Sequence, residues 1–277
     1  MSILQQSNMT LRLKPAAFTI IGVLLFWILF VGLLYSTGVI TAMFPRSLSR
    51  LAYGTLGTSV ALAVTWGYLK YKREKFRNYG LTFHAGSLRR FIQGFIIGAV
   101  IFSVMIAALL LFTDLKFTAV TKPWASSALL LYLAVFPLAL MEEVAFRGYP
   151  FVTLKKRFGL RITQVIVAIA FALYHVAGGQ DVVSSFLGPG VWAFVFGLAA
   201  ASSGGIAKPL GIHVALNLLQ LSVGMKGETG TLLKLDYPGV VTAQQIDATN
   251  NVGVVLQLVL LVAALICMEF YLKKLKK

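Results

Sequence analysis

The sequence predicts an all-α membrane protein, in which about eight transmembrane helices form one polytopic bundle. The first reason is composition: 58% of the 277 residues are hydrophobic and only 12% are charged, whereas soluble domains carry about 25% charged residues. The mean hydropathy of +0.83 is correspondingly high. The second reason is that apolar runs near the length of a membrane-spanning helix, roughly 20 residues, recur along the chain.

Eight apolar runs account for the predicted helices. The fifth and seventh are short, and the sixth is interrupted by Gly188, Pro189 and Gly190, so the count is about eight. Nothing in the sequence indicates a separate soluble domain, and residues 1–277 are expected to form a single integral membrane domain. The runs are Ala16–Tyr35, Leu51–Leu69, Phe91–Phe112, Ser126–Gly148, Ile162–Ala177, Val182–Ala201, Pro209–Gly224 and Val252–Tyr271.

The distribution of basic residues predicts the orientation. An even number of spans places both termini on one side, and assigning that side to the cytoplasm puts 19 of the 25 Lys and Arg residues there and 6 outside. Cytoplasmic loops carry such an excess of positive charge. The short loops and compact length suggest a bacterial protein, so we expect an integral protein of the bacterial plasma membrane with cytoplasmic termini. The basic connector Lys70–Tyr79 is expected to contact anionic lipid headgroups rather than nucleic acid.

Few side chains within the apolar runs can take part in acid–base chemistry or polar catalysis. Glu142 and Glu143 directly follow the run ALLLYLAVFPLALM, His175 lies in FALYHVAGG, and His213 and Asn217 lie in GIHVALNLL. Ionisable groups inside a membrane are costly and usually functional. Their concentration marks a candidate site, and the core that carries it extends over about residues 126–224.

Helical spacing places these side chains on common helix faces. Residues three or four apart are neighbours on a helix, and three of the predicted helices each carry one pair at i, i+4. Each pair also has a purely structural interpretation: an ion pair at a helix end, an aromatic packing contact beside a buried neutral histidine, and polar contacts that hold helices together. The pairs are Glu143 with Arg147, Phe171 with His175, and His213 with Asn217.

The depth of His175 decides whether the three segments can meet. If the fifth helix begins near Ile162, His175 lies roughly 20 Å along it, whereas Glu142 lies near the cytoplasmic end of the fourth helix. Either the fifth helix begins outside the bilayer, or the cavity is deep and the fourth helix continues past Gly148.

The residue types at this site suit hydrolysis by activated water. Desolvation raises the pKa of a carboxyl group towards the working pH, and a general base works best when its pKa is matched in this way. A second histidine with an asparagine can donate hydrogen bonds to an oxyanion. Other protease classes lack their motifs here, because neither H-E-x-x-H of zinc proteases nor G-x-G-D of intramembrane aspartyl proteases occurs.

Three motifs together carry a family resemblance. In order along the chain, EEVAFR (Glu142–Arg147), FALYH (Phe171–His175) and HVALN (His213–Asn217) resemble the motifs of the CAAX protease and bacteriocin-processing family. This family, also called Abi or CPBP, includes the Ras-converting CAAX endoprotease. Each motif alone is short, but all three on successive apolar segments are specific, and the resemblance covers about Ala139–Leu219.

The resemblance implies a function and a role for each motif residue. It implies an eight-helix intramembrane glutamic endopeptidase whose site opens towards the cytoplasm. Glu142 and His175 would activate water, and His213 and Asn217 would form the oxyanion hole. Glu143 and Arg147 are family positions too, with structural roles. In eukaryotes the family resemblance implies removal of three residues after a prenylated cysteine, and bacterial relatives are linked to bacteriocin immunity, peptide maturation or regulation of surface proteins.

Several alternatives remain open at the level of sequence. Glu142 with two histidines could bind zinc, but Asn217 and the second carboxylate suit a metal-free mechanism better, so no cofactor is expected. The expected partners are a peptide or lipidated protein substrate and membrane lipids. A catalytically silent scaffold or bacteriocin-immunity protein of the same fold, and a proton-coupled transporter, are the competing functions. The substrate, its prenylation and the oligomeric state are not determined by the sequence.

Overall fold

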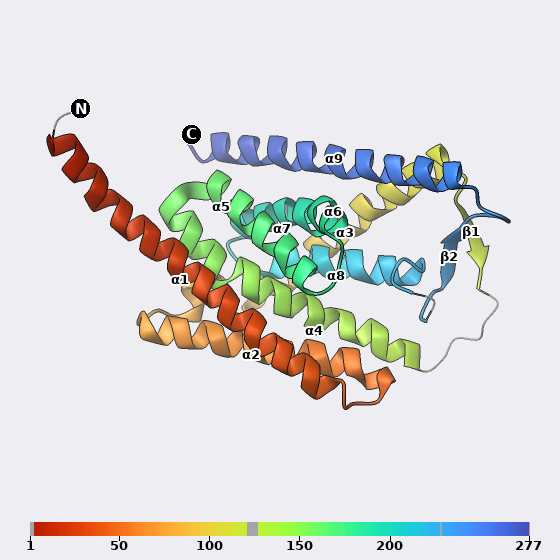
Figure 1. Cartoon of the computed structure of the whole chain (residues 1–277), viewed down its shortest axis with the longest axis horizontal. Helices are drawn as coiled ribbons and strands as arrows, with labels where there is room; N and C mark the ends of the chain where they lie inside the picture. The colour runs from red at the N-terminus through yellow and green to blue at the C-terminus, as the bar shows by residue number, and fades with distance from the viewer. Residues whose placement is uncertain (1–2, 121–126, 228, 277) are drawn as a thin grey trace.

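The computed structural model describes residues 3–120, 127–227 and 229–276, with side chains described from Ala16 onward (Figure 1). The described residues form a bundle of long helices with one small pair of strands. Ser126, the first residue of the fourth predicted span, lies outside the described part of the chain. The helices are α1 (Ile3–Thr41), α2 (Arg46–Tyr71), η1 (Phe76–Tyr79), α3 (Ala85–Phe112), α4 (Ser127–Arg147), α5 (Tyr149–Ala177), α6 (Val182–Ser185), η2 (Phe186–Gly190), α7 (Val191–Ser203), α8 (Ala207–Ser222) and α9 (Ala243–Lys274).

The two strands close one end of the bundle. β1 (Lys116–Ala119) and β2 (Leu233–Asp236) pair antiparallel, with Lys116 opposite Asp236. The beginning of α1 and the end of α9 lie together at the opposite end (Figure 1). A chain that starts and finishes at the same end of a bundle crosses it an even number of times.

The surface of the bundle is apolar in the way that a lipid environment requires. Ile28 of α1 and Val259 of α9 are more than half exposed, and many other large apolar side chains are exposed with them. Soluble proteins rarely expose contiguous apolar surface on this scale. The prediction of an all-α membrane bundle is therefore confirmed.

The predicted number of spans stays a prediction. Five helical stretches of the described chain are long and apolar enough to cross a membrane, and one of them contains both α4 and α5. Helices α2 and α8 fall outside this set, and α8 has only 16 residues. The five stretches are Ala16–Thr41, Ala85–Phe112, Ser127–Ala177, Val182–Ser203 and Ala243–Lys274.

Small residues allow the central helices to pack closely. A Cβ atom on Gly57 of α2 would collide with Met141 of α4, and one on Gly98 of α3 would collide with the backbone of Ile212 in α8. Membrane helices use such small residues because close backbone approach strengthens packing between them. This packing holds α4 and α8, which carry two of the three motifs, in fixed positions.

The expected start of the fifth helix at Ile162 is wrong. Helix α4 ends at Arg147, Gly148 has non-helical backbone angles, and α5 begins at Tyr149. Within α5 the chain turns back at Gly159, whose φ of 75° interrupts the helix (Figure 1). Glu142 lies before Gly159 and His175 lies after it, at nearly equal distances along the chain. At about 1.5 Å per residue, the returning helix therefore brings His175 back to the depth of Glu142. The fourth helix therefore does not continue past Gly148, and the fifth begins well before Ile162.

Candidate active site

Glu142 and Glu143 point into different environments. Adjacent residues on a helix lie about 100° apart around its axis, so the two neighbouring carboxylates have different surroundings. The side chain of Glu143 is fully buried, whereas that of Glu142 is 15% exposed. Glu142 is thus the carboxylate of the pair that is partly accessible to solvent.

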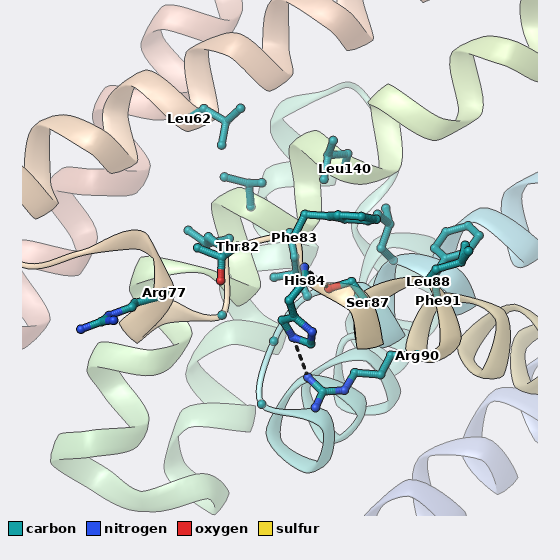
Figure 2. Close-up of a pocket in the computed structure, with 18 of the residues that line it drawn as sticks. Leu62, Arg77, Thr82, Phe83, His84, Ser87, Leu88, Arg90, Phe91 and Leu140 are labelled. Carbon is teal, nitrogen blue, oxygen red and sulfur yellow. Dashed lines mark hydrogen bonds between the residues drawn. The ribbon is translucent and has the colours of Figure 1, made fainter.

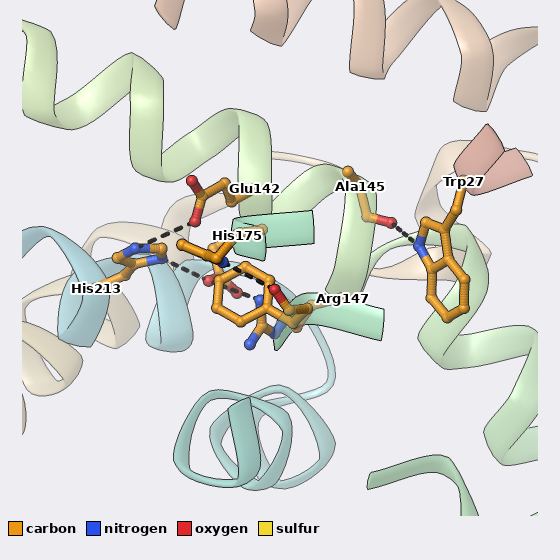
Figure 3. A network of polar contacts seen from close by, with 8 residues as sticks. Trp27, Glu142, Ala145, Arg147, His175 and His213 are labelled. Carbon is orange, nitrogen blue, oxygen red and sulfur yellow. Dashed lines mark hydrogen bonds and ion pairs between the residues drawn. The ribbon is translucent and has the colours of Figure 1, made fainter. Parts of the chain in front are cut away.

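Glu143 holds His213 and Arg147 together in the protein interior (Figure 3). Its Oε1 lies 2.8 Å from Nδ1 of His213 and 3.5 Å from Nη1 of Arg147. An ionised carboxylate only accepts hydrogen bonds, so Nδ1 of His213 is the donor. This contact fixes the orientation of the imidazole and leaves its Nε2 facing Glu142.

Arg147 is surrounded by aromatic rings. The guanidinium carbon lies 4.3 Å from the centre of the Phe171 ring and 4.9 Å from that of Phe196. The side chain is fully buried, and within the described residues its nitrogens make no hydrogen bond. The ring faces and the carboxylate of Glu143 therefore compensate its charge, since a cation over an aromatic face is stabilised more strongly when it is desolvated.

His213 contacts the exposed carboxylate of the pair. Its Nε2 lies 3.6 Å from Oε2 of Glu142 (Figure 3). The imidazole also stacks on Phe196, with ring centres 4.7 Å apart and an angle of 14° between the planes. The ring is thus held by Glu143 at one nitrogen and by Phe196 on one face, while its second nitrogen remains directed at Glu142.

His175 shares a cavity with Glu142. Its Nδ1 lies 2.8 Å from the carbonyl oxygen of Phe171, and a carbonyl only accepts, so in the neutral ring Nε2 is the acceptor. The cavity of about 640 Å³ is lined by helices α1, α2, α4 and α5. Tyr53 and Tyr174, which are hydrogen-bonded to one another, also line it. A carboxylate, an imidazole and two phenols therefore face one space.

The residues that line this cavity indicate which end of the bundle it faces. Gly38 and Ala42, near the C-terminal end of α1, and Gln180, just beyond α5, form part of its wall. These residues lie near the loop between α1 and α2 and near the loop after α5, so the cavity extends from Glu142 towards that end of the bundle. Which side of the membrane this end faces stays a prediction from the charge distribution.

Asn217 makes its contact with a residue that the motifs do not include. It lies one helical turn after His213 in α8, and its Oδ1 accepts a hydrogen bond of 2.6 Å from Nζ of Lys226. An ammonium only donates, so the amide must turn its oxygen to Lys226 and its NH₂ group away. Lys226 lies in a loop without any recognisable pattern, so nothing in the sequence distinguishes it.

Aromatic partners of the site were also missed from the sequence. Phe196 contacts both His213 and Arg147, yet it lies in a uniformly apolar helix where nothing distinguishes it from packing residues. Tyr174 directly precedes His175, so its proximity could have been anticipated. Phe171, which the motif did include, lies against His175, His213 and Arg147 at once.

The fold and the three motif segments define a class of protein. Helices α4, α5 and α8 of an all-α membrane bundle carry three motifs that resemble those of the CAAX protease family. More particularly, residues 123–219 match the family model described as "Type II CAAX prenyl endopeptidase Rce1-like". The match confirms the resemblance to this family that the motifs carry. No curated protein matches the chain.

The His, Cys, Asp and Glu side chains of the site are its candidate metal ligands. Within the described residues, no three His, Cys, Asp or Glu side chains are grouped closely enough to hold a metal ion. Glu142 and His213 approach each other, but the second nitrogen of His213 is occupied by Glu143. The expectation of a metal-free enzyme stays a prediction, and metal analysis is its test.

Proposed function

We propose that the protein is an intramembrane glutamic endopeptidase that hydrolyses a peptide bond of a membrane-associated or lipidated peptide. The observation that carries this proposal is the position of Glu142, which faces Nε2 of His213 and shares a cavity with His175. The family match supports the reaction class. The excess of basic residues on one side supports an orientation with both termini in the cytoplasm.

The proposed chemistry begins with a water molecule between Glu142 and His175. Glu142 takes a proton from the water as its oxygen attacks the carbonyl carbon of the substrate, and His175 holds the water through Nε2. The carbonyl electrons move to the oxygen and form a tetrahedral oxyanion. The proton then passes from Glu142 to the amide nitrogen as the C–N bond breaks.

His213 and Asn217 are proposed to stabilise the oxyanion. For His213 to donate from Nε2 while Nδ1 donates to Glu143, the ring must carry both protons, and the carboxylates of Glu142 and Glu143 together balance the charges of this ring and of Arg147. The second donor is the NH₂ group of Asn217, which the contact with Lys226 turns away from the ammonium. Fixed donors of this kind stabilise the charge that develops in the transition state.

Cleavage of a defined peptide tests the proposed function. Purified protein in proteoliposomes is incubated with a peptide that ends in a prenylated cysteine and three further residues, and the products are analysed by mass spectrometry. We expect a new carboxyl terminus at the cysteine. The same peptide without the prenyl group measures whether the lipid is required. If both peptides remain intact under conditions in which the protein is folded, the chain is a silent scaffold of the same fold.

The pH dependence tests the proposed role of Lys226 in orienting Asn217. The residue as a whole is exposed, but its ammonium lies among protein groups, and this desolvation lowers its pKa to about 8, with Arg50 acting in the same direction and Glu142 opposing it. Below that pH the ammonium donates to Asn217. Above it the neutral amine can also accept, so the orientation of the amide is lost and the rate should fall.

Two variants and a control separate this effect from other titrations. In Lys226→Arg the fall in rate should move to higher pH, because arginine keeps its proton. In Lys226→Met the rate should be low throughout, by up to the roughly 10²–10³-fold that the loss of one oxyanion donor costs. Lys116→Met removes an exposed charge from β1 and should behave as wild type. An unchanged pH profile in Lys226→Arg would refute the role.

A further inference from the structure

A second cavity lies apart from the Glu142 site (Figure 2). It has a volume of about 510 Å³ and shares no residue with the cavity that Glu142 and His175 line. Ligand cavities in proteins range over about 300–1,000 Å³. Its walls come from four helices and are apolar, formed by Leu62 of α2, Leu88 and Phe91 of α3, Leu140 and Val144 of α4, and Leu210 of α8.

The mouth of this cavity is cationic. Arg77, His84 and Arg90 line it together with Ser87. Within the described part of the chain, neither Arg77 nor Arg90 forms an ion pair with a carboxylate; Nη1 of Arg90 instead lies 3.2 Å from Nε2 of His84. An apolar space with unneutralised cations at its entrance is suited to a ligand with an apolar chain and an anionic head.

The contacts of His84 give a separate indication of an anion. Its Nδ1 accepts a hydrogen bond from the backbone N–H of Gly86 and caps the start of α3. A neutral imidazole has one acceptor nitrogen, so Nε2 must carry the proton. Nε2–H and the guanidinium of Arg90 are then two donors that face each other at 3.2 Å. An acceptor placed beside both, such as a phosphate oxygen, would satisfy them.

The position of the mouth matches the headgroup region of a membrane. It lies on the connector between α2 and α3, which the charge distribution places in the cytoplasm, and Phe83 beside it is 86% exposed. An exposed phenyl ring beside arginines suits the membrane interface, where the ring meets the acyl boundary and the charges meet the headgroups. The apolar walls then continue from this level into the depth of the hydrocarbon core.

We propose that this cavity binds an anionic phospholipid, with its phosphate at His84 and Arg90 and one acyl chain between α2, α3, α4 and α8. A prenyl group on a peptide fits less well, because it brings no anion to the cationic mouth. Val144 adjoins Glu143 on α4, so the bound chain packs against the helix that carries both site carboxylates. The lipid thereby supports the position of that helix without entering the Glu142 cavity.

Lipid retention and thermal stability test the proposal. The full-length protein is purified in neutral detergent and supplied with phosphatidylglycerol or phosphatidylcholine, and bound lipid and Tm are measured. We expect about one retained phosphatidylglycerol per chain and a higher Tm, with neither effect from phosphatidylcholine. Inorganic phosphate should not raise Tm, because it lacks the chain; an equal effect would reduce the site to a simple anion site and overturn the proposal.

Three variants locate the binding. Arg90→Gln should weaken retention about tenfold or more, because it removes a charge-assisted contact to the phosphate. Arg77→Gln should weaken it less, because the Arg77 side chain points away from His84 and Arg90 and acts on the phosphate only from a distance (Figure 2). Leu62→Trp should block the chain without changing charge, and Leu62 is exposed enough for the fold to tolerate it. Arg89→Gln, on the same helix but outside the cavity lining, is the matched control. Unchanged retention in all three cavity variants, or displacement of the phospholipid by a prenylated peptide, would overturn the proposal.

Discussion

Replacing Glu142 by glutamine should abolish peptide hydrolysis while the folded protein remains intact. The amide cannot take a proton from water, and removal of a general base commonly costs a factor of about 10²–10⁴ in rate. The fold should survive because the Glu142 side chain is 15% exposed and glutamine keeps its size and polarity. The turnover of a prenylated peptide by Glu142→Gln, measured at equal amounts of monodisperse protein, is the test.

A matched variant controls for the loss of a carboxylate as such. Glu74→Gln removes an acidic side chain from the connector after α2, where its contact is with Asn78, and should retain wild-type turnover. Near wild-type turnover in Glu142→Gln would exclude Glu142 as the base. It would not exclude hydrolysis by the protein, which the cleavage experiment measures independently.

A second large loss of activity is expected when either proposed hydrogen-bond donor to the oxyanion is removed. His213→Ala and Asn217→Ala should each reduce the rate by about 10²–10³. Together they should cost less than the product of the two factors, because both donors act on one oxygen atom as a unit. Asn251→Ala replaces an exposed amide on α9 and provides the control. A double variant whose loss equals the full product would indicate two independent roles.

Metal content measured on the same variants separates the glutamate mechanism from a zinc mechanism. If the glutamate mechanism operates, wild-type protein should contain less than one metal ion per chain and retain activity in strong chelator. If the zinc mechanism operates, one zinc per chain should be lost in His213→Ala and kept in Asn217→Ala, because only the histidine is a zinc ligand. A zinc pattern of that kind would overturn the metal-free proposal.

Much of the site follows from local rules that a sequence displays. Apolar runs predict helices because a membrane requires continuous backbone hydrogen bonding within each segment. The spacing of Glu143 and Arg147 predicts their contact because helix geometry fixes neighbours at i, i+4, and the two side chains do lie 3.5 Å apart. The three motifs identify the family because they carry their residues in one order along the chain.

The tertiary structure alone decided how these segments meet. The reversal at Gly159 brings His175 to the depth of Glu142, and the packing of α8 against α4 assigns His213 to both carboxylates, with Nδ1 at Glu143 and Nε2 at Glu142. Lys226 reaches Asn217 from a loop without a motif. Helix periodicity fixes which residues share a face, but the partner of that face depends on the direction and rotation of helices distant in sequence. The sequence alone therefore determined most of the helices and predicted the residues of the site, whereas packing between helices decided which carboxylate is buried and which lines the cavity.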